Sequence, residues 1–118
     1  GDDYFASARL TRQQARDSAI SLLEDAAKQE DADQSVANQA SESIQVLASY
    51  TLKEAQIENL VTAKGYQDCV AFMGDDSLSI VVSTKDGELN ATDVAKITDI
   101  AMTETGYAAN AIRIMAAN

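Results

Sequence analysis

Apolar residues recur at three- and four-residue spacing through the first half of the chain, which is the periodicity of amphipathic helices. Thr11 and Gln14 have the spacing of a capping box, so a first helix is predicted to begin at Thr11. Its apolar face is thin, because several of its members are alanine. The acidic segment 30–33 separates it from a second helix, which is predicted to run from Ser35 to Lys64 and to end at Gly65.

Beyond Gly65 the pattern changes to short runs rich in Val and Ile, which are separated by glycines and polar turns. Residues 68–73 and 78–84 are two such runs, and they flank the polar turn Gly74–Ser77. Two apolar runs around a tight turn predict a β-hairpin.

A third helix is predicted from Asn90 or Thr92 to Thr105, with Gly106 closing it, and a last strand over residues 111–115. A sheet with one apolar face has to bury that face against helices. We therefore predict an α+β sandwich, in which a three-stranded sheet carries two helices on one face and is preceded by an extra N-terminal helix. The predicted division is an N-terminal helical stalk, 1–33, and an α+β domain, 34–118.

The composition excludes most enzyme templates. The chain has 118 residues, no His, one Cys, and 9 Lys+Arg against 19 Asp+Glu, for a formal net charge of −10. Without His there is no His-based catalytic triad and no His-ligated zinc, and one Cys cannot form a CxxC pair. Such a charge repels a phosphate backbone, so no nucleic acid partner is expected. We predict no enzymatic activity, no catalytic residue, no cofactor and no metal site, and we predict that Cys69 is a core residue.

Three arginines, Arg9, Arg12 and Arg16, lie within eight positions on roughly one helical face. Two interpretations stay open. The arginines could be membrane-proximal and meet anionic lipid headgroups if a membrane anchor lies upstream, or they could form an ordinary solvated helix face.

Several segments resemble a known family. Residues 3–12, 57–66, 68–73 and 95–100 read DYFASARLTR, IENLVTAKGY, DCVAFM and AKITDI, and residues 111–115 read AIRIM. Together they resemble the extracytoplasmic part of the stage III sporulation protein AH family. The segment from 29 to 55 is similar in composition alone.

The resemblance implies a single-pass membrane protein of endospore-forming bacteria, made in the mother cell, with this domain in the extracytoplasmic space that faces the forespore. Family members bind stage II sporulation protein Q, and the pair is thought to build a channel across both membranes. The family domain resembles the ring-building motif of type III secretion and flagellar ring proteins, whose element order is helix, strand, strand, helix, strand. The membrane helix of the family is absent from this sequence, and the resemblance implies no catalytic residues.

The expected function is therefore a non-enzymatic channel subunit that binds stage II sporulation protein Q and assembles into a membrane-associated homo-oligomeric ring. The alternative is a monomeric extracytoplasmic adaptor that binds one partner without forming a ring. A ring needs two different patches on each protomer. One predicted patch is the free sheet edge with the open sheet face, and the other is the outer side of the helix that ends at Thr105. The residues predicted for the sheet patch are Ser79, Val81, Ser83 and Arg113.

Overall fold

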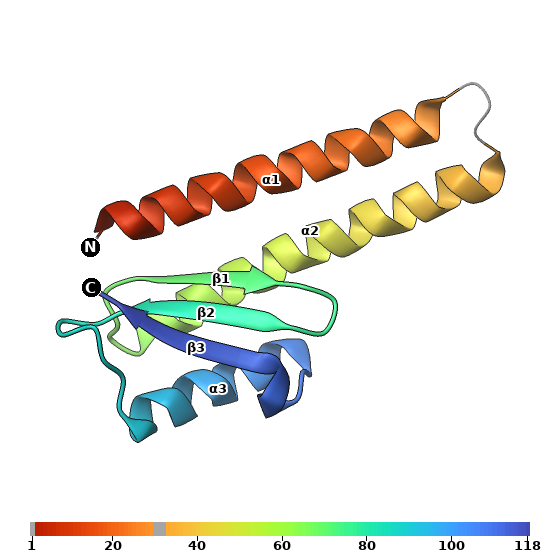
Figure 1. The fold of residues 1–118 in the computed structure, drawn as a ribbon. Helices are drawn as coiled ribbons and strands as arrows, with labels where there is room; N and C mark the ends of the chain where they lie inside the picture. Colours follow the sequence, from red (N-terminus) through yellow and green to blue (C-terminus); the bar gives the residue numbers. More distant parts are fainter. Residues whose placement is uncertain (1, 30–32) are drawn as a thin grey trace.

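The computed structural model describes residues 2–29 and 33–118 (Figure 1). Within these ranges the helices are α1 (Asp2–Lys28), α2 (Gln34–Ala63) and α3 (Ala91–Thr105), and the strands are β1 (Cys69–Met73), β2 (Leu78–Ser83) and β3 (Ile112–Ala117). A short 3-10 helix, η1 (Ala109–Ala111), precedes β3. The order of elements is the predicted one.

Local side-chain chemistry sets the ends of the helices. The Asp33 carboxylate accepts a hydrogen bond from the Val36 N–H at 2.9 Å and caps the start of α2. Asn90 and Asp93 form a reciprocal capping box at the start of α3. Gly106 closes α3 with a φ of 74°, a left-handed conformation that glycine adopts without steric cost.

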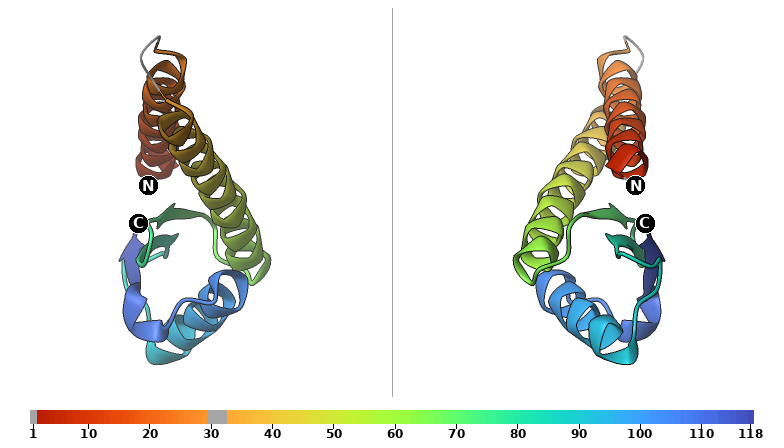
Figure 2. Two further views of the ribbon diagram at one scale, coloured as in Figure 1. Left: turned by 90° about the vertical axis from the view of Figure 1, so that its right-hand side faces the viewer. Right: turned by 90° about the vertical axis from the view of Figure 1, so that its left-hand side faces the viewer.

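The strands form one sheet in the order β1-β2-β3. β1 and β2 are antiparallel across the predicted hairpin, whereas β2 and β3 are parallel and α3 makes the crossover between them. α2 and α3 lie side by side on one face of the sheet (Figure 2). The predicted α+β arrangement with two helices on one face is confirmed.

The main core lies between these two helices and the sheet. Its fully or almost fully buried members come from α2, α3 and the inward positions of β1 and β2: Ile57, Val61, Cys69, Ala71, Leu78, Ile80, Val82, Ile97 and Ala101. The predicted core location of Cys69 is confirmed, because this residue has no exposed surface.

The opposite face of the sheet meets α1. This helix runs antiparallel to α2 as one arm of a long helical hairpin, and its first turns lie close to β1 and the end of β3 (Figures 1 and 2). The Phe5 ring is fully buried against Val70 and Val81, with Ala8 and Ala117 beside it. The first turns of α1 therefore contribute a second, smaller core.

The predicted start of the first helix is wrong. α1 begins at Asp2 and runs through Thr11, which lies in its middle. Ala6, Ala8, Arg9 and Leu10 are good helix formers, and burial of Phe5 stabilises the helical conformation before Thr11, so the local capping signal has no effect. The division of the chain at residue 33 stays a prediction.

Candidate functional site: the two edges of the sheet

The sheet has two edge strands, β1 and β3, because β2 lies between them. An edge strand presents backbone N–H and C=O groups that have no partner in the sheet, and it can pair with a strand of another protein. The two edges of this sheet are treated differently by the rest of the chain.

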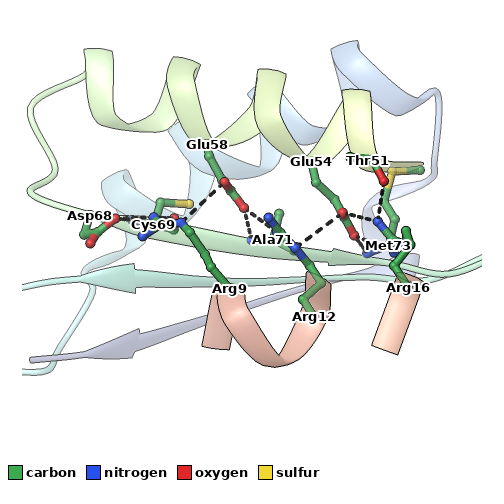
Figure 3. A network of polar contacts seen from close by, with 10 residues as sticks. All are labelled: Arg9, Arg12, Arg16, Thr51, Glu54, Glu58, Asp68, Cys69, Ala71 and Met73. Atoms are coloured by element: carbon green, nitrogen blue, oxygen red, sulfur yellow. Dashed lines mark hydrogen bonds and ion pairs between the residues drawn. The ribbon is translucent and has the colours of Figure 1, made fainter. Parts of the chain in front are cut away.

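Two carboxylates of α2 accept hydrogen bonds from backbone N–H groups on the outer side of β1 (Figure 3). The Ala71 N–H donates to Glu58 Oε2 at 2.8 Å, and the Met73 N–H donates to Glu54 Oε2 at 2.8 Å. The Cys69 N–H donates to the carboxylate of Asp68, also at 2.8 Å. The amide donors of three alternate residues of β1 are thus satisfied by side chains.

Two guanidinium groups of α1 donate hydrogen bonds to backbone carbonyls on the same outer side of β1. Arg9 Nη2 donates to the Cys69 carbonyl at 2.5 Å, and Arg12 Nη1 donates to the Ala71 carbonyl at 2.5 Å. Figure 3 shows the arginines reaching from α1 into the gap between α2 and β1. Side chains here make the hydrogen bonds that a fourth strand would otherwise make.

The same charged groups pair with one another. Arg12 contacts Glu58 at 2.6 Å and Glu54 at 3.6 Å, and Arg16 Nη1 contacts Glu54 Oε1 at 2.5 Å. Arg9 pairs with Asp68 and lies 3.8 Å from Glu58. We call this set the edge network; its members are Arg9, Arg12, Arg16, Glu54, Glu58 and Asp68.

Burial makes the edge network more than a set of surface ion pairs. The Glu54 side chain has no exposed surface, and those of Arg12 and Arg16 are 18% and 14% exposed. Charge-assisted hydrogen bonds are stronger than neutral ones, and they gain further where water is excluded. Because three cations face three carboxylates, the network is formally neutral and the full charge of −10 lies on the rest of the chain.

Two pKa shifts follow from this geometry. The hydrogen bond to Asp68 raises the pKa of the Arg9 guanidinium against the opposing effect of burial. Burial alone would raise the pKa of Asp68, but the hydrogen bonds from Arg9 and from the Cys69 N–H hold it below its ordinary value. Both groups stay charged at neutral pH, which keeps the contact intact.

The three arginines do not form the solvated helix face that was one of the two interpretations of their spacing. They point toward α2 and β1, where carboxylates of α2 and carbonyls of β1 accept their hydrogen bonds. Whether this segment lies near a membrane stays a prediction. Among residues 2–29 and 33–118, no helix is long and apolar enough to cross a bilayer.

The other edge, β3, pairs only with β2 within the described part of the chain. The register places Arg113 beside Ser79, Met115 beside Val81, and Ala117 beside Ser83. These six residues alternate onto one face of the sheet, the face toward α1. Arg113 and Met115 are exposed, and Met115 retains 43% of its surface.

The structure brings the four predicted partner-binding residues to one sheet face, although they differ in access. Ser79 and Ser83 are half-buried, and Arg113 is exposed. Val81 is only 6% exposed, because the Phe5 ring of α1 covers it. The expectation that Val81 lies on an open face is therefore wrong, and the partner-binding role of the set stays a prediction.

The sequence analysis missed the carboxylates of the edge network. A signal was present, since Glu54 and Glu58 precede Ile57 and Val61 by three positions each and so share the apolar side of α2. Two acids on an apolar helix face need buried cations, and the arginine triplet of α1 has matching spacing. The described residues contain no group of three or more His, Cys, Asp or Glu side chains arranged to hold a metal ion.

The fold is an α+β domain with the helix-strand-strand-helix-strand order of the ring-building motif and an additional N-terminal helix. A family model described as SpoIIIAH-like protein matches residues 1–114, and the chain therefore belongs to the SpoIIIAH-like family. A search of curated proteins gives no match.

Two solved structures share the fold. One is described as the structure of the SpoIIQ-SpoIIIAH pore forming complex; it matches with a TM-score of 0.79 and 20% identity, over 97% of this chain and 98% of that chain. The other is the type III secretion system protein EscJ of enteropathogenic E. coli, with a TM-score of 0.55 and 23% identity, over 64% of this chain and 50% of that chain. Neither description names an enzymatic activity.

Proposed function

We propose that this chain is a non-enzymatic, extracytoplasmic subunit of the mother cell to forespore channel, which binds SpoIIQ, the stage II sporulation protein Q of the forespore. Membership of the SpoIIIAH-like family and the similarity to the SpoIIIAH fold support this proposal. The observation that indicates the binding site is the difference between the two sheet edges. Side chains satisfy the outer backbone groups of β1, whereas β3 is open.

The proposed docking edge is β3. A partner strand that adds to an open edge gains main-chain hydrogen bonds without rearranging the domain. The neighbouring sheet face offers the exposed Arg113 and Met115 with the half-buried Ser79 beside them, which supply one cation, one flexible apolar group and one hydroxyl. Val81 packs against Phe5 in the second core and is not exposed to a partner, so a Val81→Glu variant would test folding and not binding.

A proline on the open edge tests this site. The Ala117 carbonyl accepts from the Thr84 N–H, so it faces the β2 side, and by alternation the Ala116 N–H faces away from the sheet. Ala116→Pro removes that outward donor and keeps the pairing with β2. Ala91→Pro is the matched control, because it places a proline at the first position of α3, where helices accept it.

The assay is size-exclusion chromatography with light scattering of each variant mixed with the extracytoplasmic domain of SpoIIQ. We expect a defined complex for the wild type and for Ala91→Pro, and separate peaks for Ala116→Pro. A complex that tolerates Ala116→Pro would exclude the β3 edge, and no complex with the wild type would refute direct binding of this domain.

Assembly into a ring is the second part of the proposal. Identical subunits at −10 repel one another, so ring formation relies on the membrane anchor and the partner to concentrate and align them. The outer side of α3 exposes Val94 and Met102, each 39% exposed, and is the candidate second patch. Sedimentation in solution and cross-linking on vesicles, with the chain tethered by its N-terminus, separate the two functions. Oligomers on vesicles alone are expected for a ring subunit, and monomers in both states for an adaptor.

A further inference from the structure

The edge network is built from two halves with different attachments. Glu54 and Glu58 belong to α2, which also supplies Ile57 and Val61 to the main core. The arginines belong to α1, in which Phe5 is the fully buried apolar side chain. Most other apolar residues of α1 are alanines or, like Leu10 and Leu22, are exposed. The carboxylate half is thus anchored to the domain, and the arginine half can leave with α1 while the main core stays intact.

Departure of α1 would change the β1 edge in three ways. The carbonyls of Cys69 and Ala71 would lose their donors. Glu54 and Glu58 would lose their cations, and an unpaired carboxylate is driven toward water, which frees the N–H groups of Ala71 and Met73. The apolar surface under Phe5 would also be uncovered.

We propose that α1 is a clasp that keeps the β1 edge closed, and that release of this clasp turns β1 into an acceptor for the β3 strand of a second copy of this chain. The second copy fits for two reasons. Its β3 is the open, apolar strand of the fold, and Arg113 is a cation on that strand that matches the carboxylates left behind by the arginines. A β3-to-β1 contact joins two different patches, so it is a head-to-tail contact.

This inference concerns self-association and does not depend on binding of SpoIIQ. Because both contacts use the β3 edge, one β3 strand can make only one of them at a time. The release variant is Arg9→Glu with Arg12→Glu, which leaves five carboxylates facing Arg16 as their one cation, where the edge network was neutral. The matched control is Lys28→Glu with Lys64→Glu, which changes the net charge equally at two exposed positions away from the edge. Both are measured by sedimentation velocity at increasing protein concentration without a partner.

We expect the wild type and the lysine control to keep one mass, and the release variant to grow in mass with concentration. Adding Ala116→Pro to the release variant should restore the wild-type mass, because it blocks the open edge of β3. A folded release variant of unchanged mass would overturn the proposal. Association that persists with Ala116→Pro would overturn the assignment of β3 as the occupant.

Hydrogen exchange shows whether the release variant is folded. The Ala71 amide should exchange faster once its edge opens, whereas the Phe72 amide faces β2 and should stay protected. If both amides lose protection, the milder variant Phe5→Ser replaces the charge reversal, since it loosens α1 without creating carboxylate repulsion. An unchanged mass of a folded Phe5→Ser variant would then overturn the proposal, and association that persists with Ala116→Pro would overturn the assignment of β3.

Discussion

Glu54 is the side chain on which the edge network depends most. Among the described residues it is the charged one with no exposed surface, and its carboxylate serves three groups. Arg16 contacts it at 2.5 and 3.2 Å, Arg12 at 3.6 Å, and the Met73 N–H at 2.8 Å. We therefore predict that Glu54→Ala is among the most destabilising single changes in this domain.

The magnitude follows from what the variant leaves unpaired. Removing one partner of a buried ion pair costs about 3–5 kcal/mol. Arg12 and Arg16 keep some contact with water, so the lower end of this range applies to them. The Met73 N–H also loses its acceptor, which adds about 1 kcal/mol. We expect a loss of about 4 kcal/mol, against a total stability of about 5–15 kcal/mol for a domain of ordinary stability.

Glu54→Gln separates charge from hydrogen bonding. The amide oxygen still accepts from the Met73 N–H, but the charge that the arginines need is gone, so we expect a loss of about 2 kcal/mol. Glu42→Ala, on the exposed side of the same helix, is the control and should stay within about 0.5 kcal/mol of the wild type.

Urea unfolding followed by circular dichroism measures all three variants, and an unchanged dependence on urea shows that the same transition is compared. The reasoning would be refuted if Glu54→Ala lost no more stability than Glu42→Ala. That result would mean that the cost of burying these charges cancels what their pairing contributes.

Three further predictions concern the neighbours of the edge network. Phe5→Ala should cost about 3 kcal/mol because it empties the second core, whereas Leu10→Ala on the exposed side of α1 should cost little; equal urea midpoints would contradict this. The pKa of Asp68 is lowered in the folded protein, so its charge stabilises the fold above the unfolded-state pKa of about 4, and this contribution is lost as the pH falls through the folded-state pKa. The wild type and Asp68→Asn should therefore differ in stability at neutral pH and converge in acid. Burial raises the pKa of the Cys69 thiol to about 12, so a thiol reagent at neutral pH should react in urea and not with the folded protein; rapid labelling of the native protein would show that β1 opens frequently.

The local elements of this domain were predictable from the sequence because their signals are local. The apolar runs 68–73 and 78–84 with the polar turn between them predicted the hairpin, and Asn90 and Gly106 marked the ends of α3. Thr11 shows the limit of such signals. Its capping pattern is real, but a cap acts only where a helix begins, and contacts made by Phe5 place that beginning nine residues earlier.

The candidate site could not be predicted in the same way. Each arginine of α1 lies more than thirty positions from the carboxylate that it contacts, and a triplet of this spacing is equally compatible with a solvated face or a lipid surface. The sequence likewise could not predict which strand forms the open edge, because a hairpin and a final strand do not specify which of the strands lies in the middle of the sheet.

The sequence by itself determined the type and order of the elements, the α+β class, the acidic charge and the family resemblance, since periodicity, turn chemistry and composition depend on neighbouring residues. The tertiary structure alone decided that α1 covers the second face of the sheet, that Arg9 and Arg12 close β1, and that β3 stays open. The physical reason is that a buried charge or an outer backbone group is satisfied by whatever group the fold brings within hydrogen-bonding distance, and that proximity is a property of the packed chain.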